Sequence, residues 1–180
     1  VDYVHSFMNP SSVLMVEAKV SYSDYAHNGF GTSDVVLIND DICHIIDLKY
    51  GRGISVDADN NTQLMLYALG VYQEFYFKYD FKHFELHIFQ PRTKNITQWS
   101  ISLDDLLIFG EKVKKASYDI LNNNTTYAPS DKACQWCNHK GNCNALQKHT
   151  EKIIGSEFDD LTLAPVETVD YKSMLDNKSL

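Results

Sequence analysis

Hydrophobic and polar positions in the first quarter of the chain alternate with a period of two and are interrupted by short polar turns. Residues 11–22 predict a half-buried strand with two different faces, one carrying Met15, Glu17 and Lys19 and the other Leu14, Val16, Ala18 and Val20. Residues 32–38 and 42–49 are two further apolar runs, separated by a polar turn at residues 39–41. We therefore expect an antiparallel meander of three strands.

Two later segments have helical patterns. Residues 61–77 carry apolar side chains around most of the helix circumference, which is typical of a largely buried helix, and we expect Asp59 or Asn60 to cap it. Residues 103–121 predict a second helix whose acidic first turn and basic later turns suit the helix dipole. Ser102 is the expected N-cap of this helix.

Two more strands, residues 83–91 and 96–103, lie between these helices and are joined by a polar turn. The order of strands, helix, strands and helix predicts an α/β fold with a central mixed sheet flanked by helices. This core is expected to occupy residues 1–125. A cysteine segment with a short helix from about Asn144 follows in residues 126–155, and residues 156–180 form an acidic, loosely attached tail with one short helix after Pro165.

Composition and charge narrow the class of protein. With 44% hydrophobic and 22% charged residues, the 180-residue chain is globular, and no stretch approaches the roughly 20 apolar residues of a membrane span. Nothing at the start resembles a signal peptide, so we expect a cytoplasmic protein. The start, "VDYVHSFM", is typical of the end of a helix, and we expect the natural protein to extend upstream. A net charge of -8 argues against indiscriminate binding of nucleic acid, but a local basic groove is compatible with it.

The end of the third predicted strand carries charge where apolar residues are expected. Asp47 and Lys49 are two apart and share a face, and Leu48 points to the other side. If the hairpin pairs as expected, Asp34 lies opposite Asp47 or Lys49. Two carboxylates and the Leu48 carbonyl could then bind one divalent cation. The alternative is a structural ion pair between Asp34 and Lys49.

Two carboxylates and a lysine around one metal ion suit phosphodiester hydrolysis, because the metal polarises the phosphoryl group and the lysine stabilises charge. Gln63 and Tyr67 lie four apart on one face of the following helix. The turn at residues 49–53 precedes them, and its glycines permit close approach of a substrate backbone. Taken alone, a glutamine and a tyrosine at this spacing are usually a surface and a core residue.

These segments resemble a known family. "GTSD", "IIDLKYG" and "QLMLY" look like the successive motifs of the RecB-like branch of the PD-(D/E)XK nucleases. "GFGTSD", "HIIDLKYGRG", "NTQLMLYALG" and "HIFQPR" more closely resemble an uncharacterised exonuclease family of phages and prophages. The resemblance covers the chain from about Glu17 to Cys143. It implies a PD-(D/E)XK core that acts on DNA.

The resemblance also implies roles for individual residues. Asp34 and Asp47 would bind Mg²⁺ or Mn²⁺, Lys49 would be the catalytic lysine, and Gln63 and Tyr67 would order the site or the DNA strand. Glu17 matches a further acidic metal-site residue of such cores; alternatively it is only a strand-face partner of Lys19. RecB-like nucleases commonly add an upstream helical histidine. Neither His5 nor His27 fits, so we expect that ligand to precede this chain.

Three cysteines follow the core in a C-x2-C-x5-C array: Cys134, Cys137 and Cys143. In a reducing compartment such an array favours metal or cluster binding over disulfides. It is similar to the C-terminal triplet of iron-sulfur RecB-like CRISPR-associated exonucleases, which implies a [4Fe–4S] cluster whose fourth cysteine lies outside this chain. Zinc bound with His139 and three free thiols are the alternatives. Cys43 is expected to be an ordinary buried cysteine in the sheet.

The sequence therefore predicts a divalent-metal-dependent DNA exonuclease of phage or prophage recombination or DNA end processing. Its expected partners are DNA, and a second copy of the chain or a phage recombination protein, with no membrane. Two other functions remain open. A catalytically silent nuclease fold would serve as a DNA-binding or assembly module, and a structural protein with a metal clip would bind metal at the thiols and none at Asp47.

Overall fold

The computed structural model describes residues 1–51 and 55–158. The chain divides into two compact units, Val1–Thr125 and Thr126–Leu180. Arg52 and Gly53 of the predicted glycine turn lie outside the described residues, as does the helix predicted after Pro165. Within the described ranges, none of the helices has the length and apolar content of a membrane span.

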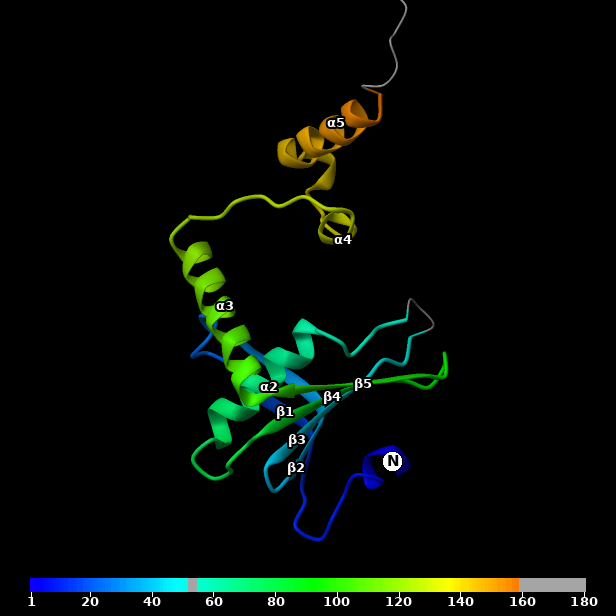
Figure 1. Cartoon of the computed structure of the whole chain (residues 1–180), viewed down its shortest axis with the longest axis vertical. Coiled ribbons are helices and arrows are strands. Elements are labelled where there is room, and N and C mark those ends of the chain that lie inside the picture. Colours follow the sequence, from blue (N-terminus) through cyan, green and yellow to red (C-terminus); the bar gives the residue numbers. More distant parts are fainter. Residues whose placement is uncertain (52–54, 159–180) are drawn as a thin grey trace, which may run out of the picture. The chain divides into compact units, whose positions relative to one another are not determined.

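The first unit contains a five-stranded sheet in the order β1-β2-β3-β4-β5 (Figure 1). Strands β1, β2 and β3 pair antiparallel, which confirms the predicted meander. Strand β4 pairs parallel to β3 and antiparallel to β5, so the sheet is mixed as expected. A parallel neighbour needs a long crossover, and helix α2 supplies it. The strands span Val13–Ser21, Phe30–Asn39, Ile42–Leu48, His83–Gln90 and Asn95–Ser102.

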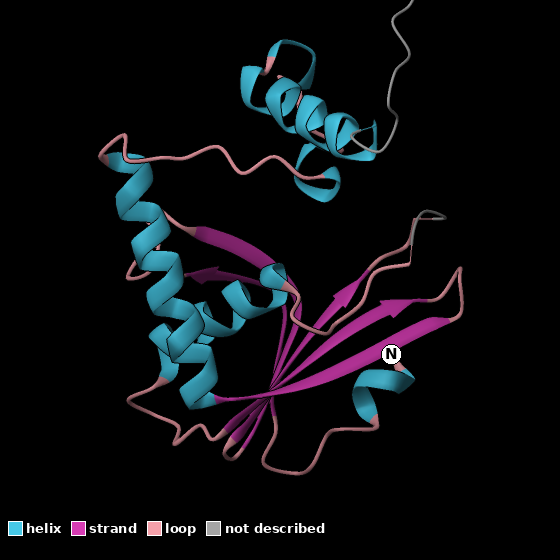
Figure 2. Cartoon of the chain, turned by 45° about the horizontal axis from the view of Figure 1, so that its top comes forward, coloured by secondary structure: helices cyan, strands magenta, loops and turns pink. Residues whose placement is uncertain are grey.

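Helices α2 (Thr62–Phe75) and α3 (Leu103–Leu121) lie on one face of the sheet (Figure 2). The core forms where α2 packs on the strands, through buried side chains such as Leu64, Ala68 and Val71. Their spacing of four and three residues keeps them on the inward face of the helix. The packing of α2 on the sheet places the first turn of the helix beside the end of strand β3.

The two predicted helix caps have different outcomes. Ser102 caps α3, since its Oγ accepts a hydrogen bond from the Asp105 backbone N–H, as predicted. The prediction of Asp59 or Asn60 as the cap of α2 is wrong. Asn61 is the cap instead, and its side chain accepts from the Gln63 and Leu64 backbone N–H groups. Three possible capping residues occur in a row, and the backbone geometry selects the last.

Strand β1 changes faces in its middle, which the alternating pattern does not predict. Met15 packs on the helix-covered core, and so do Ala18 and Val20, although their positions have opposite parity. Glu17 lies between them with a left-handed φ of 52°. The kink reverses which positions face the core while the pairing register with β2 continues. The predicted assignment of Met15 and Ala18 to different faces is therefore wrong.

On the other face of the sheet, Tyr3 of α1 (Asp2–His5) and Phe7 contact strands β3 and β4. The Tyr3 hydroxyl lies 2.9 Å from Nδ1 of His87, and His87 Nε2 lies 3.2 Å from Nδ1 of His44. Phe7 packs against both histidine rings. Burial lowers the pKa of both histidines. For His87, burial and the neighbouring His44 together lower the pKa to about 4, although Glu85 opposes this shift.

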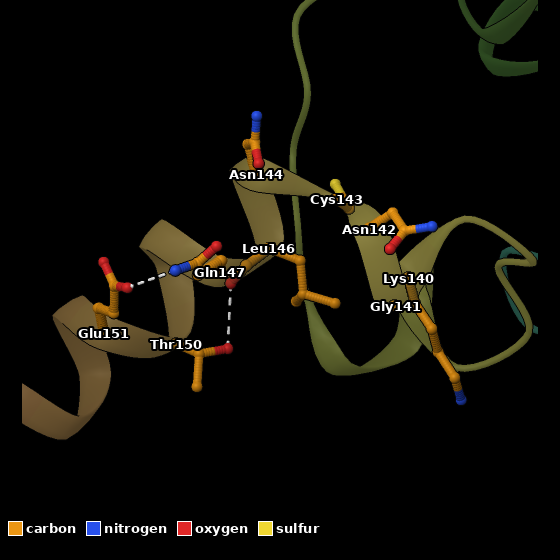
Figure 3. Close-up of a pocket in the computed structure, with 9 residues that line it drawn as sticks. All are labelled: Lys140, Gly141, Asn142, Cys143, Asn144, Leu146, Gln147, Thr150 and Glu151. Atoms are coloured by element: carbon orange, nitrogen blue, oxygen red, sulfur yellow. Dashed lines mark hydrogen bonds between the residues drawn. The ribbon is translucent and has the colours of Figure 1, made fainter.

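The described part of the second unit contains two short helices, α4 (Asp131–Cys134) and η1 (Lys140–Asn142), and the longer helix α5 (Asn144–Phe158). Helix α5 starts where the sequence predicts a helix, and it continues past the predicted start of the tail at Ser156. A hollow of about 590 Å³ is lined by residues of η1 and the first turns of α5, among them Cys143. Figure 3 shows these residues; along α5, Gln147 donates to Glu151, and the Thr150 hydroxyl donates to the Leu146 carbonyl.

Candidate active site

The cluster at the end of strand β3 begins with Asp47 and Lys49. Asp47 is 4% exposed and is the last buried residue of the strand. The Lys49 backbone N–H donates to the Phe89 carbonyl, which extends the parallel ladder beyond the strand and fixes the lysine backbone. The two side chains therefore share a face, and Lys49 Nζ lies 2.9 Å from Asp47 Oδ2.

Gln63 connects this pair to helix α2. Its Oε1 accepts a hydrogen bond from Lys49 Nζ at 3.1 Å, and its Nε2 donates to Asp47 Oδ1 at 3.3 Å. The same Nε2 group donates to the Tyr67 hydroxyl at 2.8 Å. Because Asn61 caps the helix through the Gln63 backbone N–H, the first turn of α2 places this amide directly beside the carboxylate.

Tyr67 reaches the cluster because strand β2 has a glycine beneath it. A Cβ atom at Gly31 would lie 2.4 Å from Tyr67 Cε1, closer than side chains tolerate. The first residue of the "GTSD" motif is therefore a glycine so that the tyrosine ring can rest on the strand. The sequence pattern does not predict this role for Gly31, and the available signal was its place three positions before the predicted metal ligand Asp34.

One oxygen of the cluster is incompletely satisfied. Asp47 Oδ2 is buried, and within the described part of the chain no donor reaches it in hydrogen-bonding geometry, even though Lys49 Nζ is close. A buried carboxylate oxygen without a full set of partners is costly. It is also the kind of ligand that Mg²⁺ prefers, since Mg²⁺ sites commonly use one or two carboxylates and several waters. The residues therefore fit a divalent cation.

Asp34 approaches the cluster from strand β2. Continuing the register of Val35 with Ile46 places Asp34 opposite Asp47, as expected. Its Oδ2 accepts a hydrogen bond from the Leu48 backbone N–H at 2.7 Å, so it stabilises the end of β3. In the described ranges Lys49 pairs with Asp47, and no Asp34 to Lys49 ion pair forms, contrary to the alternative reading of the sequence.

Glu17 is placed near the cluster by register only. It falls opposite Asp34, since the flanking pairs are Val16 with Val35 and Ala18 with Ser33. Its side chain is exposed, and its left-handed backbone φ distinguishes it from its neighbours in the strand. Among the described residues, no three His, Cys, Asp or Glu side chains converge as a ready metal site. The candidate centre thus rests on two carboxylates.

The cysteine triplet lies in the second unit. Cys134 and Cys143 are partly buried, and Cys137 is exposed. Backbone hydrogen bonds link the Cys137 N–H to the Cys134 carbonyl and the Gln147 N–H to the Cys143 carbonyl. Cys43 is fully buried in the sheet as expected, and burial raises the pKa of its thiol. Burial therefore favours the protonated thiol over the thiolate.

The fold and the cluster together define an α/β protein with an acid–lysine centre at the end of a central strand. A family model described as a protein of unknown function, DUF2800, matches residues 1–179, and the chain belongs to this family. Among solved structures, the crystal structure of SSO0001 is similar with a TM-score of 0.38 and 15% sequence identity. That match covers 73% of this chain, and the chain spans 60% of the length of SSO0001.

Proposed function

We propose that this chain is a divalent-metal-dependent DNA nuclease with a PD-(D/E)XK core of RecB-like type. More narrowly, we infer an exonuclease that acts in phage or prophage recombination or DNA end processing. The observation that carries the proposal is the buried Asp47 Oδ2, which lies beside Lys49 and lacks a hydrogen-bond donor in the described part of the chain. The Lys49 ammonium, 2.9 Å away, offsets part of the cost of burying this oxygen, and a divalent cation would offset the rest.

In this proposal, Asp47 and Asp34 hold Mg²⁺ or Mn²⁺, with the Leu48 carbonyl as a further ligand. When bound, the cation supplies Lewis-acid polarisation of the phosphoryl group and a bound water of lowered pKa. Lys49 stabilises the negative charge that develops on the phosphate, and Gln63 holds its ammonium in place. Tyr67 fixes the orientation of the Gln63 amide through its hydroxyl.

The proposal extends to the cysteine segment. Cys134, Cys137 and Cys143 would supply three thiolates of a [4Fe–4S] cluster, which needs one further ligand besides these three. Zinc held by the triplet and His139 is the alternative. In the described range from Thr126 to Gly155 no residue is buried, and a unit of this size usually needs a metal, a disulfide or a partner to be stable.

The test compares two Asp-x-Lys sequences within the chain. Asp80 and Lys82 have the same spacing as Asp47 and Lys49 and form a 2.7 Å ion pair, but both are exposed. We expect Asp47→Asn and Lys49→Ala each to slow Mn²⁺-dependent release of nucleotides from end-labelled linear DNA by about a hundredfold or more. Asp80→Asn and Lys82→Ala are the matched controls, and they should degrade DNA at the wild-type rate.

The outcomes separate the candidate functions. Degradation that is lost with Asp47→Asn, while a covalently closed DNA circle stays intact, supports a metal-dependent exonuclease. DNA binding without any Asp47-dependent degradation supports the silent binding module instead. Equal degradation by wild type and by Asp47→Asn would overturn the site assignment, provided that circular dichroism shows both proteins folded.

A further inference from the structure

Tyr50 directly follows Lys49 and is 64% exposed. The Arg92 guanidinium lies over its ring, with Cζ 5.1 Å from the ring centroid. We call these two side chains the Tyr50–Arg92 pair. A single exposed aromatic residue is ordinary on a protein surface. This one differs because it is adjacent in sequence to the lysine of the acid–lysine cluster, and because a distant segment supplies a planar cation to its ring.

Hydrogen bonds position the turn that bears Arg92. Gln90 Oε1, at the end of β4, accepts from the Val56 backbone N–H at 2.8 Å. Asn95 Nδ2, at the start of β5, donates to the Val56 carbonyl at 2.9 Å and to Gln90 Oε1 at 2.7 Å. These bonds fasten the two ends of the turn that bears Arg92 to Val56. An arginine positioned in advance in this way binds a ligand at a lower entropic cost.

We propose that the Tyr50–Arg92 pair is a stacking platform for one unpaired base of a single-stranded DNA end. The inference rests on the proposed nuclease function and names its substrate class. Aromatic rings bind bases through their π faces, and an arginine stacked on the ring adds a cation–π contribution. Arg92 also places a positive charge over the Tyr50 ring on a chain whose net charge is -8. This charge favours binding of the negatively charged phosphate backbone at this part of the surface.

The geometry selects an unpaired base rather than a duplex. Bases within a duplex cover each other's faces, so only an unstacked base can lie on the tyrosine ring. One sugar joins the base and phosphate of a nucleotide, and consecutive Cα atoms such as those of Lys49 and Tyr50 are about 3.8 Å apart. This spacing is within the span of one nucleotide, so a nucleotide whose phosphate lies beside Lys49 can reach the Tyr50 ring with its base. We expect single-stranded or frayed ends to be preferred over blunt duplex ends.

The experiment measures binding of the whole chain to a labelled oligothymidylate, and to an abasic oligonucleotide of the same length, without Mg²⁺ or Mn²⁺. The abasic strand keeps the phosphates and removes the bases. Tyr50→Ala should weaken binding of the oligothymidylate by about tenfold and leave binding of the abasic strand unchanged. Tyr50→Phe keeps the ring and should bind as wild type. Tyr118→Ala is the matched control, since Tyr118 is 62% exposed on α3.

The outcomes distinguish this inference from the proposed function. Equal effects of Tyr50→Ala on both oligonucleotides, or no effect on either, would overturn the stacking platform, while Asp47-dependent degradation would still support the nuclease. If Tyr50→Ala weakens only oligothymidylate binding but no Asp47-dependent degradation occurs, the platform stands and the nuclease proposal fails. Loss of binding with Tyr118→Ala also counts against the platform, because it shows that any exposed tyrosine contributes.

Discussion

The two compact units of the chain hold their candidate functional side chains in different ways. In Val1–Thr125, Asp47 is buried at the end of a strand with hydrogen-bonded neighbours on both sides, and Gln63 reaches it from a packed helix. In the described range from Thr126 to Gly155 no residue is buried, and Trp136 is 80% exposed. The segments that carry the cysteines are connected in this range by backbone hydrogen bonds and by one bond from Lys140 Nζ to the Gln135 carbonyl.

This difference indicates where the geometry of each site comes from. Packing on the sheet positions the acid–lysine cluster before any ligand binds, which is the preorganisation that catalysis requires. The thiols lie on short elements without a core, and a bound metal would be the centre that orders them. We therefore expect substitutions in the first unit to act through packing and substitutions in the second unit to act through the metal.

The largest expected effect comes from the cysteines. Replacing Cys134, Cys137 and Cys143 together with serine should abolish bound iron or zinc in protein purified without oxygen. Structural metal sites contribute about 10 kcal/mol or more to folding. Amide exchange protection in α5 should therefore be lost, while protection in the first unit is unchanged. Cys43→Ala is the control and should keep the metal. Unchanged metal content in the triple variant would contradict this prediction.

A smaller effect on stability is expected from a change of pH, through the buried histidine His87 of the first unit. The pKa of His87 is lowered to about 4 in the folded protein, against 6.5 when exposed. The unfolded chain therefore takes up a proton as the pH falls below about 6.5 and the folded chain does not, so stability decreases toward acid. The loss should reach roughly 2 kcal/mol between about pH 7.5 and pH 5.

Urea unfolding at several pH values measures this loss. His87→Phe removes the titrating group, and it should flatten the decrease in unfolding free energy even if it lowers stability overall. His83→Gln is the matched control, because His83 is exposed on the same strand. The prediction is contradicted if wild type and His87→Phe lose the same free energy between the two pH values.

The local sequence pattern predicts the helices, the strands and the cluster around Asp47 and Lys49. It does not predict the contacts between segments that are far apart in the chain. Asp47 and Asp80 both begin an Asp-x-Lys sequence, and the apolar run before Asp47 distinguishes the buried one from the exposed one. Nothing in the pattern brings Tyr3 onto His87, since the contact joins residues far apart in the chain. The alternation around Glu17 was misleading, because a left-handed kink there reverses the faces of the strand.

The next effect concerns how closely helix α2 lies on the sheet. Gly31→Ala adds a Cβ atom 2.4 Å from Tyr67 Cε1, so the ring must move and its hydrogen bond from Gln63 is strained. We expect a loss of about 1–3 kcal/mol of stability. The cost should largely vanish in a Tyr67→Ala background, which a double-mutant cycle measures. Gly141→Ala, where the added atom meets open space, is the control.

The smallest effect separates the stability of a helix from the position of the site. Asn61 caps α2 and Ser102 caps α3, so replacing either residue with alanine should cost about 1 kcal/mol of unfolding free energy. Only Asn61→Ala loosens the turn that carries Gln63, and it should slow Asp47-dependent DNA degradation several-fold, whereas Ser102→Ala should not. Equal rates in two variants of equal stability would show that the cap of α2 holds the helix without positioning the amide.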